Sequence, residues 1–230
     1  MTVFFQVVKD IVNRSQLDRV CEEMDLRMQQ AEVDPGRNPV GFASRYKILH
    51  QLGQHPHTQA MVTDLVDRCI PEDERPTLIA FVRQHQSNFL HTDNNPNQGR
   101  GRTVLLPLRN IVEGVDRTVV FDHSTITDPR SDILDASEAK TRILAEARQR
   151  PPVADHMVRY QMEHCGPVVD HLRMAGVFEY RLGDAVSFDA HALHASSDWN
   201  RHSPERTHKD YLLMHTTHRD GLNYPESLPS

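Results

Sequence analysis

His91 and Asp93 stand two residues apart in the stretch FLHTDN, between an apolar approach and a run that is typical of a strand. Residues i and i+2 of a strand, or of the mouth of one, point to the same side. An imidazole nitrogen and a carboxylate oxygen could therefore meet at one point, which predicts two ligands of a metal ion. The alternative is a solvated polar turn, because residues 94–97 directly downstream (NNPN) have turn chemistry.

A third ligand must come from a distant strand, because two ligands hold a metal poorly. The stretch RLGDAVSFDAHALHAS predicts a turn at Gly183, a strand over residues 185–188 and then two histidines, His191 and His194. Either histidine could be the third ligand, and we prefer His194 because an arginine, Arg206, follows it. Two histidines plus one carboxylate on one face are the donor set of non-haem Fe(II) oxygenases, which keep the opposite coordination positions open.

Arg206 offers a planar guanidinium that can bind a carboxylate through two parallel hydrogen bonds. A cosubstrate that carries a carboxylate needs such a group at the far end of its pocket. Lys209 is an alternative partner for that carboxylate, and Ser203 or Thr207 could assist by hydrogen bonding. The plainer interpretation of Arg206 is a surface arginine, because NRHSPERTHKD is a polar stretch.

The elements that must position these residues change in type along the chain. Up to about residue 85 the pattern is mostly helical, with apolar residues at helical spacing over 15–30 and 57–69 after a short strand at 3–8. Short β-branched or apolar runs follow, and residues 132–174 return to a helical pattern. The expected strands of this later part are 103–108, 118–121, 177–180, 185–188 and 211–216.

Short strands divided by a helical insertion predict one sandwich or barrel with helices packed outside it. Pro107 should keep its strand at an edge or at a bulge, because proline cannot donate to the sheet. The strands before the insertion are too few to fold alone. We therefore expect a single domain over 1–230, with 1–85 as mostly helical support and 86–216 as a β core that contains the insertion at 132–174.

The composition of the chain argues against several classes of protein. The chain has 230 residues and a net charge of −6, and no block of lysine and arginine alternates with aromatic residues, so nucleic acid is a poor partner. No apolar window is long enough to span a bilayer, and the N-terminal MTVFFQVVKD is too short an apolar run for a signal peptide. We expect a soluble, cytoplasmic protein. Its three cysteines are isolated, which argues against a disulfide framework and a cysteine zinc site.

Four motifs in the chain together resemble those of the 2-oxoglutarate and Fe(II)-dependent oxygenase superfamily, closest to the small hydroxylases related to prolyl hydroxylases and phytanoyl-CoA hydroxylase. The matching residues are His91-Thr92-Asp93, Gly183-Asp184-x-Val186-x-Phe188, Leu193-His194-Ala195-Ser196 and Arg206, and the resemblance covers roughly residues 88–216. It implies a double-stranded β-helix (jelly roll) core. It also implies that His91, Asp93 and His194 bind Fe(II), and that Arg206 binds the distal carboxylate of 2-oxoglutarate.

The resemblance further implies a reaction that consumes O2 and releases succinate and CO2. Halogenases of this superfamily have glycine or alanine in place of the aspartate, so Asp93 favours hydroxylation, desaturation or cyclisation over halogenation. Two departures are the interval before Arg206, slightly longer than is commonest in the family, and the insertion at 132–174, which could be a lid or the contact of a homodimer.

We expect a small-molecule substrate, such as an amino acid or a biosynthetic intermediate. The competing hypotheses are a cupin-type metalloenzyme that does not use 2-oxoglutarate, and a non-catalytic jelly-roll binding protein.

Overall fold

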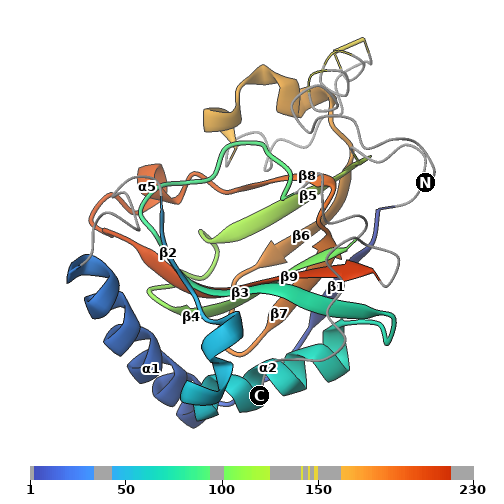
Figure 1. The fold of residues 1–230 in the computed structure, drawn as a ribbon. Helices are drawn as coiled ribbons and strands as arrows, with labels where there is room; N and C mark the ends of the chain where they lie inside the picture. Colours follow the sequence, from blue (N-terminus) through green and yellow to red (C-terminus); the bar gives the residue numbers. More distant parts are fainter. Residues whose placement is uncertain are drawn as a thin grey trace.

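The computed structural model describes residues 3–33, 43–93, 101–124, 141, 145, 148–149 and 162–218. Two antiparallel sheets face each other, and the long helices lie against the outer face of the larger one (Figure 1). The strands are β1 (Phe5–Val8), β2 (Ala43–Lys47), β3 (Glu74–Gln84), β4 (Arg102–Arg109), β5 (Arg117–Ser124), β6 (Met174–Glu179), β7 (Ala185–Asp189), β8 (Ala192–Ser196) and β9 (Lys209–His218). The α-helices are α1 (Arg14–Val33), α2 (Pro56–Cys69) and α5 (Trp199–His202), and the 3-10 helices are η1 (Leu49–Gln54), η2 (Glu163–Cys165) and η3 (Pro167–His171).

The strand order identifies a jelly roll. The larger sheet runs β1-β7-β4-β9-β3-β2 and the smaller one β6-β5-β8. An isolated antiparallel bridge between His91 and His194 extends the smaller sheet beyond β8. Because strands that are neighbours in the chain lie in different sheets, the two sheets cannot fold as separate units. The predicted β fold with flanking helices and a jelly-roll core is confirmed.

Apolar residues fill the space between the sheets and both outer faces. On β3, Ala80 and Val82 belong to the inner core between the sheets, whereas Ile79 and Phe81 face the helices. The inner core consists of Val3, Ala80, Val82, Leu105, Val120, Phe178, Tyr180, Val186, Phe188, Ala192, Tyr211 and Leu213. Since side chains of a strand alternate between faces, any residue paired with a member of the inner core also points inward.

Residues 1–85 contain the expected helical support, but they also supply three strands. Helices α1 and α2 are present, but β1, β2 and β3 all join the larger sheet, and β3 lies between β9 and β2. Both faces of β3 are covered by apolar clusters. Its sequence therefore reads as a continuous apolar run, LIAFV, which lacks the alternation of a half-exposed strand and cannot be distinguished from a buried helix.

β4 pairs with both β7 and β9, but its pairing with β7 ends at Leu105, so Pro107 has a paired strand on one side only. The register between β4 and β9 shifts between Pro107 and Arg109, so the predicted bulge accommodates the proline. Most of the expected helical insertion at 132–174 lies outside the described residues. Its described end forms η2, η3 and the start of β6. None of the described helices is long and apolar enough to span a membrane.

Candidate metal centre

Three ligand atoms, one each from His91, Asp93 and His194, lie within 4.8 Å of one another. The backbone brings them together. The N–H of each histidine donates to the carbonyl of the other at 2.9 Å, and the N–H of Asp93 donates to the carbonyl of Ala190 at 3.0 Å. His194 is paired with Val120 of the inner core, so its side chain points between the sheets. The segment 91–93 and the middle of β8 thus direct their imidazole and carboxylate groups to a single point.

Hydrogen bonds orient both imidazoles. Nδ1 of His91 lies 2.6 Å from the carbonyl oxygen of Phe89, and Nδ1 of His194 lies 3.0 Å from that of Ala192. A carbonyl only accepts, so each Nδ1 carries a proton, and Nε2 is the ring nitrogen left to bind a metal ion. The Nε2 atoms of His91 and His194 lie 3.6 and 3.2 Å from the Asp93 carboxylate. This is the usual arrangement by which a protein prepares histidines for a metal ion.

Asp93 is ionised in this environment. Burial alone would raise the pKa of its carboxyl group, but His194, and after it His215 and His91, hold that pKa well below its usual range. Its Oδ2 also accepts a hydrogen bond of 2.8 Å from the hydroxyl of Thr103. Burial lowers the pKa of His194, and the neighbouring carboxylate more than reverses that effect. A buried carboxylate among histidines is a site for a cation.

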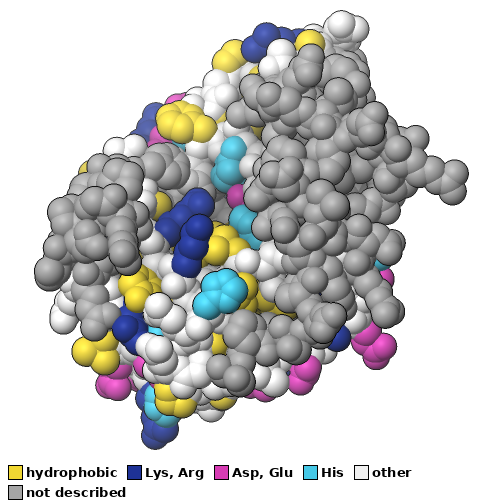
Figure 2. Space-filling model, in the orientation of Figure 1, with side chains coloured by type: hydrophobic (Ala, Val, Ile, Leu, Met, Phe, Trp, Pro, Cys, Tyr) yellow, Lys and Arg dark blue, Asp and Glu magenta, His cyan; other side chains and the backbone are white. Residues whose placement is uncertain are grey.

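The donor set fits a divalent transition metal. Two imidazole nitrogens and one carboxylate oxygen suit Fe(II), and three protein ligands leave coordination positions for other molecules. The His91 side chain is 31% exposed while those of Asp93 and His194 are nearly buried, so the centre is open on one side. Histidine, acidic and basic side chains gather in a hollow on the face shown in Figure 2. The pocket at the centre is lined by Arg45, Asn88, His91, Asp93, Leu105, Thr118, Tyr180, His194, Ser196, Tyr211 and Leu213.

Of the two histidines considered for the third position, the structure brings His194 to the cluster. His191 lies in the turn before β8 and is not part of the group that could hold a metal ion. The sequence alone could not decide between the two histidines. Which of them faces inward depends on the residue at which β8 begins, and the sequence does not show this residue.

The three residues expected to bind a carboxylate occupy different environments. Both terminal nitrogens of Arg206 contact the carboxylate of Asp116, and its guanidinium lies 4.4 Å from the centre of the Trp199 ring. Thr207 is exposed and its hydroxyl contacts the neighbouring His208, so it does not reach the pocket. Lys209 is fully buried.

Lys209 carries a buried charge that lacks a hydrogen bond. Within the part of the chain that the structure describes, its Nζ has no hydrogen-bond partner. The nearest carboxylate oxygen, Oδ1 of Asp116, is 3.7 Å away, and the ring of Tyr180, which lines the pocket, is 4.6 Å away. Burial lowers the pKa of this amine to about 8 although Asp116 acts in the opposite direction.

Two residues near the centre were not predicted. Nε2 of His215 is buried 3.9 Å from Oδ2 of Asp93, without a hydrogen-bond partner among the described residues. Arg45 lines the pocket from β2. His215 lies in the expected strand 211–216, two residues after the apolar Leu213, and could have been expected to share its face. Because the chain has 15 histidines, this signal is weak. Arg45 had none, because β2 itself was not expected.

No protein family model matches the chain, and no curated protein sequence matches it. Solved structures do match. AviO1 from Streptomyces viridochromogenes Tue57 has a TM-score of 0.56 at 11% identity, over 97% of this chain and 94% of that one. HygX from Streptomyces hygroscopicus, with nickel and 2-oxoglutarate bound, has a TM-score of 0.56 at 12% identity, over 95% and 84%.

The α-ketoglutarate (2-oxoglutarate)-dependent non-haem epimerase SnoN from nogalamycin biosynthesis has a TM-score of 0.51 at 11% identity, over 93% of this chain and 78% of SnoN. At such identities the likeness is one of fold, and it extends over nearly the whole chain. The chain therefore has the jelly-roll fold of non-haem, 2-oxoglutarate-dependent enzymes.

Proposed function

We propose that this protein is a non-haem Fe(II) and 2-oxoglutarate-dependent oxygenase that acts on a small molecule. The observation that carries the proposal is the convergence of His91, Asp93 and His194, with both Nε2 atoms directed at the carboxylate. When bound there, iron with 2-oxoglutarate and O2 supplies the oxidising power to break an unactivated C–H bond.

The three ligand residues have distinct tasks. His91 and His194 each offer a neutral nitrogen that is held in place by an Nδ1 hydrogen bond to a backbone carbonyl. Asp93 supplies the negative charge, and Thr103 fixes its carboxylate by donating to Oδ2. Phe188 packs edge-on against the His194 ring with a centroid distance of 4.8 Å, which further limits rotation of that ring. Such supporting contacts commonly alter metal affinity about 10–100-fold when they are removed.

Lys209 is the best candidate to bind the distal carboxylate of 2-oxoglutarate. Its amine is buried without a hydrogen bond among the described residues, and its one ion-pair partner there, Asp116, is already bound by Arg206. A buried charge with so little compensation favours the binding of an anion. Arg206, in contrast, already has a carboxylate partner in Asp116. The hydroxyls of Tyr180 and Thr118, which lie 2.9 Å apart and both line the pocket, can complete the hydrogen bonding. Thr207 has no part in this proposal.

We infer hydroxylation as the outcome, with the balance R–H + 2-oxoglutarate + O2 → R–OH + succinate + CO2. An aspartate at position 93 supports this, since it leaves no ligand position for a halide. This fold serves other outcomes as well, because SnoN is an epimerase. HygX has also been solved with hygromycin B bound, which supports a small biosynthetic intermediate as the substrate class here.

The test is a spectrum taken without O2. Adding Fe(II) and 2-oxoglutarate to the protein should produce a weak visible charge-transfer band, which requires both to bind at one metal. The variant His194→Ala should lose the band, and the matched control His191→Ala should keep it.

If the wild type gives no band and does not bind 2-oxoglutarate, the proposed function is wrong. If the band survives His194→Ala but vanishes in His191→Ala, the function stands and only the third ligand changes. Release of succinate across a panel of small metabolites, with mass spectrometry for a gain of one oxygen, then identifies the substrate.

A further inference from the structure

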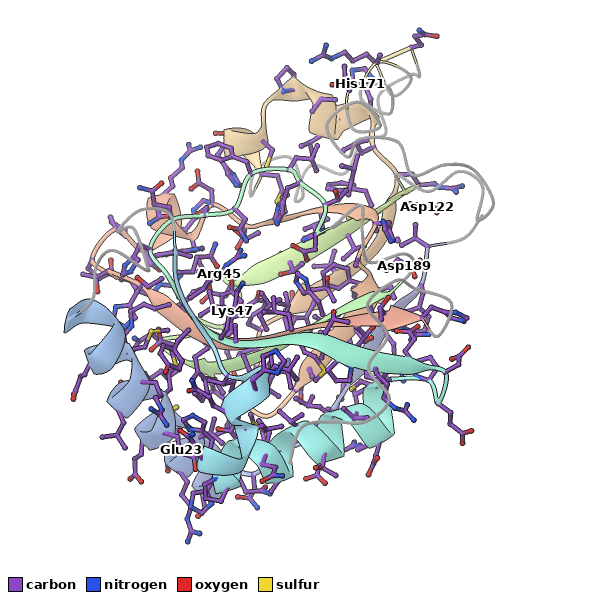
Figure 3. All side chains as sticks on the ribbon, in the orientation of Figure 1. Glu23, Arg45, Lys47, Asp122, His171 and Asp189 are labelled. Atoms are coloured by element: carbon purple, nitrogen blue, oxygen red, sulfur yellow. The ribbon has the colours of Figure 1, made fainter. Side chains whose placement is uncertain are left out.

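Strand β2 presents two basic side chains to the inside of the jelly roll. Arg45 is paired with Val82 and Lys47 with Ala80, and both partners belong to the inner core. Residues paired across an antiparallel sheet share a face. Arg45 and Lys47 therefore point inward, while Tyr46 between them packs against the apolar cluster on the helical side. Figure 3 labels the two basic residues next to each other on β2.

Arg45 belongs to the wall of the metal pocket. It lines the same pocket as the three ligand residues. Its positive charge also reaches inward, because it lowers the pKa of the buried Tyr211 and His215, though by less than burial changes them. Tyr211 lies in register with Val82, so Arg45 is two strands, roughly 10 Å, from Tyr211 along the sheet.

Neither basic side chain has a partner in the described ranges of the chain. Arg45 and Lys47 are exposed, and no hydrogen bond or ion pair joins either of them to a described residue. Among the described residues that line the pocket, the only carboxylate is that of Asp93, whose charge a metal ion would neutralise. A protein with a net charge of −6 therefore keeps a positive rim on its metal pocket, and such a rim attracts anions.

We propose that Arg45 and Lys47 bind an anionic group, a phosphate, sulfate or carboxylate, on the substrate that is oxidised. The guanidinium can hold such a group through two hydrogen bonds, and the ammonium adds a second charge two residues along the same face. This inference rests on the proposed function, since it names the substrate class of the same site. It assigns the rim to the oxidised substrate because Lys209 serves the cosubstrate.

A structural role is the alternative. β2 is the last strand of its sheet, and charged residues on edge strands discourage pairing with other chains. Protection of an edge strand requires charged residues on β2 but does not require them at particular positions. It does not predict that a bound anion lies near the metal, and this difference can be measured.

The experiment uses Mn(II) in place of Fe(II), saturating 2-oxoglutarate and inorganic phosphate as the probe. Mn(II) accelerates the 31P relaxation of a phosphate that binds near it, with a steep dependence on distance. In the wild type the acceleration should saturate with phosphate. Arg45→Gln and Lys47→Gln should each weaken phosphate binding several-fold and the double variant should abolish it, while binding of Mn(II) and 2-oxoglutarate stays unchanged. The matched controls Arg14→Gln, at the start of α1, and Lys9→Gln, just after β1, are both exposed and do not line the pocket, so they should behave as wild type.

Three results would overturn the inference. The relaxation could fail to saturate, it could be unaffected by both substitutions, or Arg45→Gln could weaken 2-oxoglutarate instead of phosphate, which would make Arg45 a cosubstrate residue. Failure of the proposed function looks different, because Mn(II) or 2-oxoglutarate would then not bind the wild type at all. An effect of Mn(II) that persists when the metal site is disabled by His194→Ala would show phosphate contact with free Mn(II), and this too counts against the rim.

Discussion

Lys209 and Asp210 are neighbours on β9, both fully buried, and they point to opposite faces of the larger sheet. Asp210 faces the helices and Lys209 faces the inner core. Each belongs to a cluster of charged side chains, and the two clusters differ in how well their charges are matched. On the helical side of the strand, positive and negative charges are equal in number, as in a network that stabilises the fold. On the inner side one positive charge is in excess, as in a site that binds an anion.

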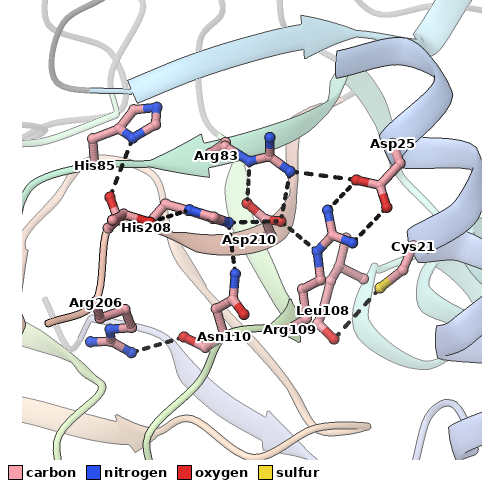
Figure 4. A network of polar contacts seen from close by, with 11 residues as sticks. Cys21, Asp25, Arg83, His85, Leu108, Arg109, Asn110, Arg206, His208 and Asp210 are labelled. Atoms are coloured by element: carbon pink, nitrogen blue, oxygen red, sulfur yellow. Dashed lines mark hydrogen bonds and ion pairs between the residues drawn. The ribbon is translucent and has the colours of Figure 1, made fainter. Parts of the chain in front are cut away.

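The network around Asp210 is complete. Arg83 donates to both carboxylate oxygens at 3.1 and 3.2 Å, and Arg109 donates to Oδ2 at 2.7 Å. Arg109 also contacts both oxygens of Asp25 on α1, and Arg83 reaches the same carboxylate at 3.5 Å (Figure 4). Two cations therefore face two anions, and the network ties α1 to strands β3, β4 and β9.

The cluster around Asp116 is not balanced. Arg206 and Lys209 share this single carboxylate, and only Arg206 forms hydrogen bonds with it. The cluster has one positive charge in excess, and the unsatisfied Nζ lies against Tyr180 in the pocket wall. A complete network stabilises the fold, whereas the excess charge is satisfied only when an anion binds. The comparison predicts that substitutions on the two faces of β9 affect different properties.

Asp210→Asn should have the largest effect, and it should act on stability. Removing one anion leaves two partly buried guanidinium groups with one carboxylate, and breaking a pair of this kind costs about 3 kcal/mol of unfolding free energy. Urea denaturation measures the change. Asp18→Asn is the control, because the ion pair of Asp18 with Arg14 is exposed and should contribute less than about 1 kcal/mol. The comparison breaks down if Asp210→Asn leaves stability unchanged, or if folded Asp210→Asn protein no longer binds metal.

Lys209→Met should affect binding and spare the fold. The affinity for 2-oxoglutarate should fall by roughly 10–100-fold, the value of a hydrogen bond to a charged group. Stability should be unchanged or higher, because methionine fills similar space without a buried charge, and Asp116 keeps Arg206 as its partner. Calorimetric binding of 2-oxoglutarate to the Mn(II) protein and urea denaturation test both halves. Lys47→Met is the control and should keep the cosubstrate affinity. A large loss of stability with unchanged affinity would make Lys209 structural and remove the distinction between the faces.

The sequence predicted the metal cluster better than it predicted these charge clusters. His91 and Asp93 could be found because their i, i+2 spacing is a local signal, and His194 because it follows the apolar run 185–188. Arg206 and Lys209 were also singled out, but their order of preference depends on Asp116, which lies far away in the chain and had no distinguishing feature in sequence. Which of the two cations, Arg206 or Lys209, forms hydrogen bonds to Asp116 depends on contacts between residues that are far apart in the sequence.

The fold shows the same limit. The strands 103–108, 118–121, 177–180, 185–188 and 211–216 were each found within a few residues of β4, β5, β6, β7 and β9. β2, β3 and β8 were missed; β8 is buried along its whole length, so it shows no alternation of apolar and exposed residues. β3 is buried on both faces, and β2 carries basic residues at its inward positions, so neither shows the apolar alternation that marks a strand.

The pH dependence of cosubstrate binding sharpens the comparison. Burial places the pKa of Lys209 at about 8 in the free protein, and only the protonated amine attracts a carboxylate. Affinity for 2-oxoglutarate should be nearly constant below this pH and then weaken by at most about tenfold per pH unit above it, with uptake of a proton on binding. The same depressed pKa adds stability to the empty protein as pH rises from about 8 towards the usual pKa of lysine, because the folded state then no longer holds a buried charge. Isothermal titration in two buffers of different ionisation enthalpy detects the proton. In Lys209→Met the dependence should vanish, and a wild-type affinity that is flat through this range contradicts the assignment.

Arg206→Gln has the smallest expected effect and separates the two cations of the inner cluster. The charge of Arg206 lowers the pKa of Lys209, and Asp116 raises it. Without Arg206 the carboxylate of Asp116 acts on Lys209 alone, so the pKa of the amine should rise. The pH above which 2-oxoglutarate affinity declines should move upward accordingly, while affinity at neutral pH changes little. If Arg206 itself holds the cosubstrate, affinity falls at every pH and the midpoint does not move. The dependence of 2-oxoglutarate affinity on pH therefore decides whether Lys209 or Arg206 binds the cosubstrate. It also tests whether the excess positive charge around Asp116 serves to bind an anion.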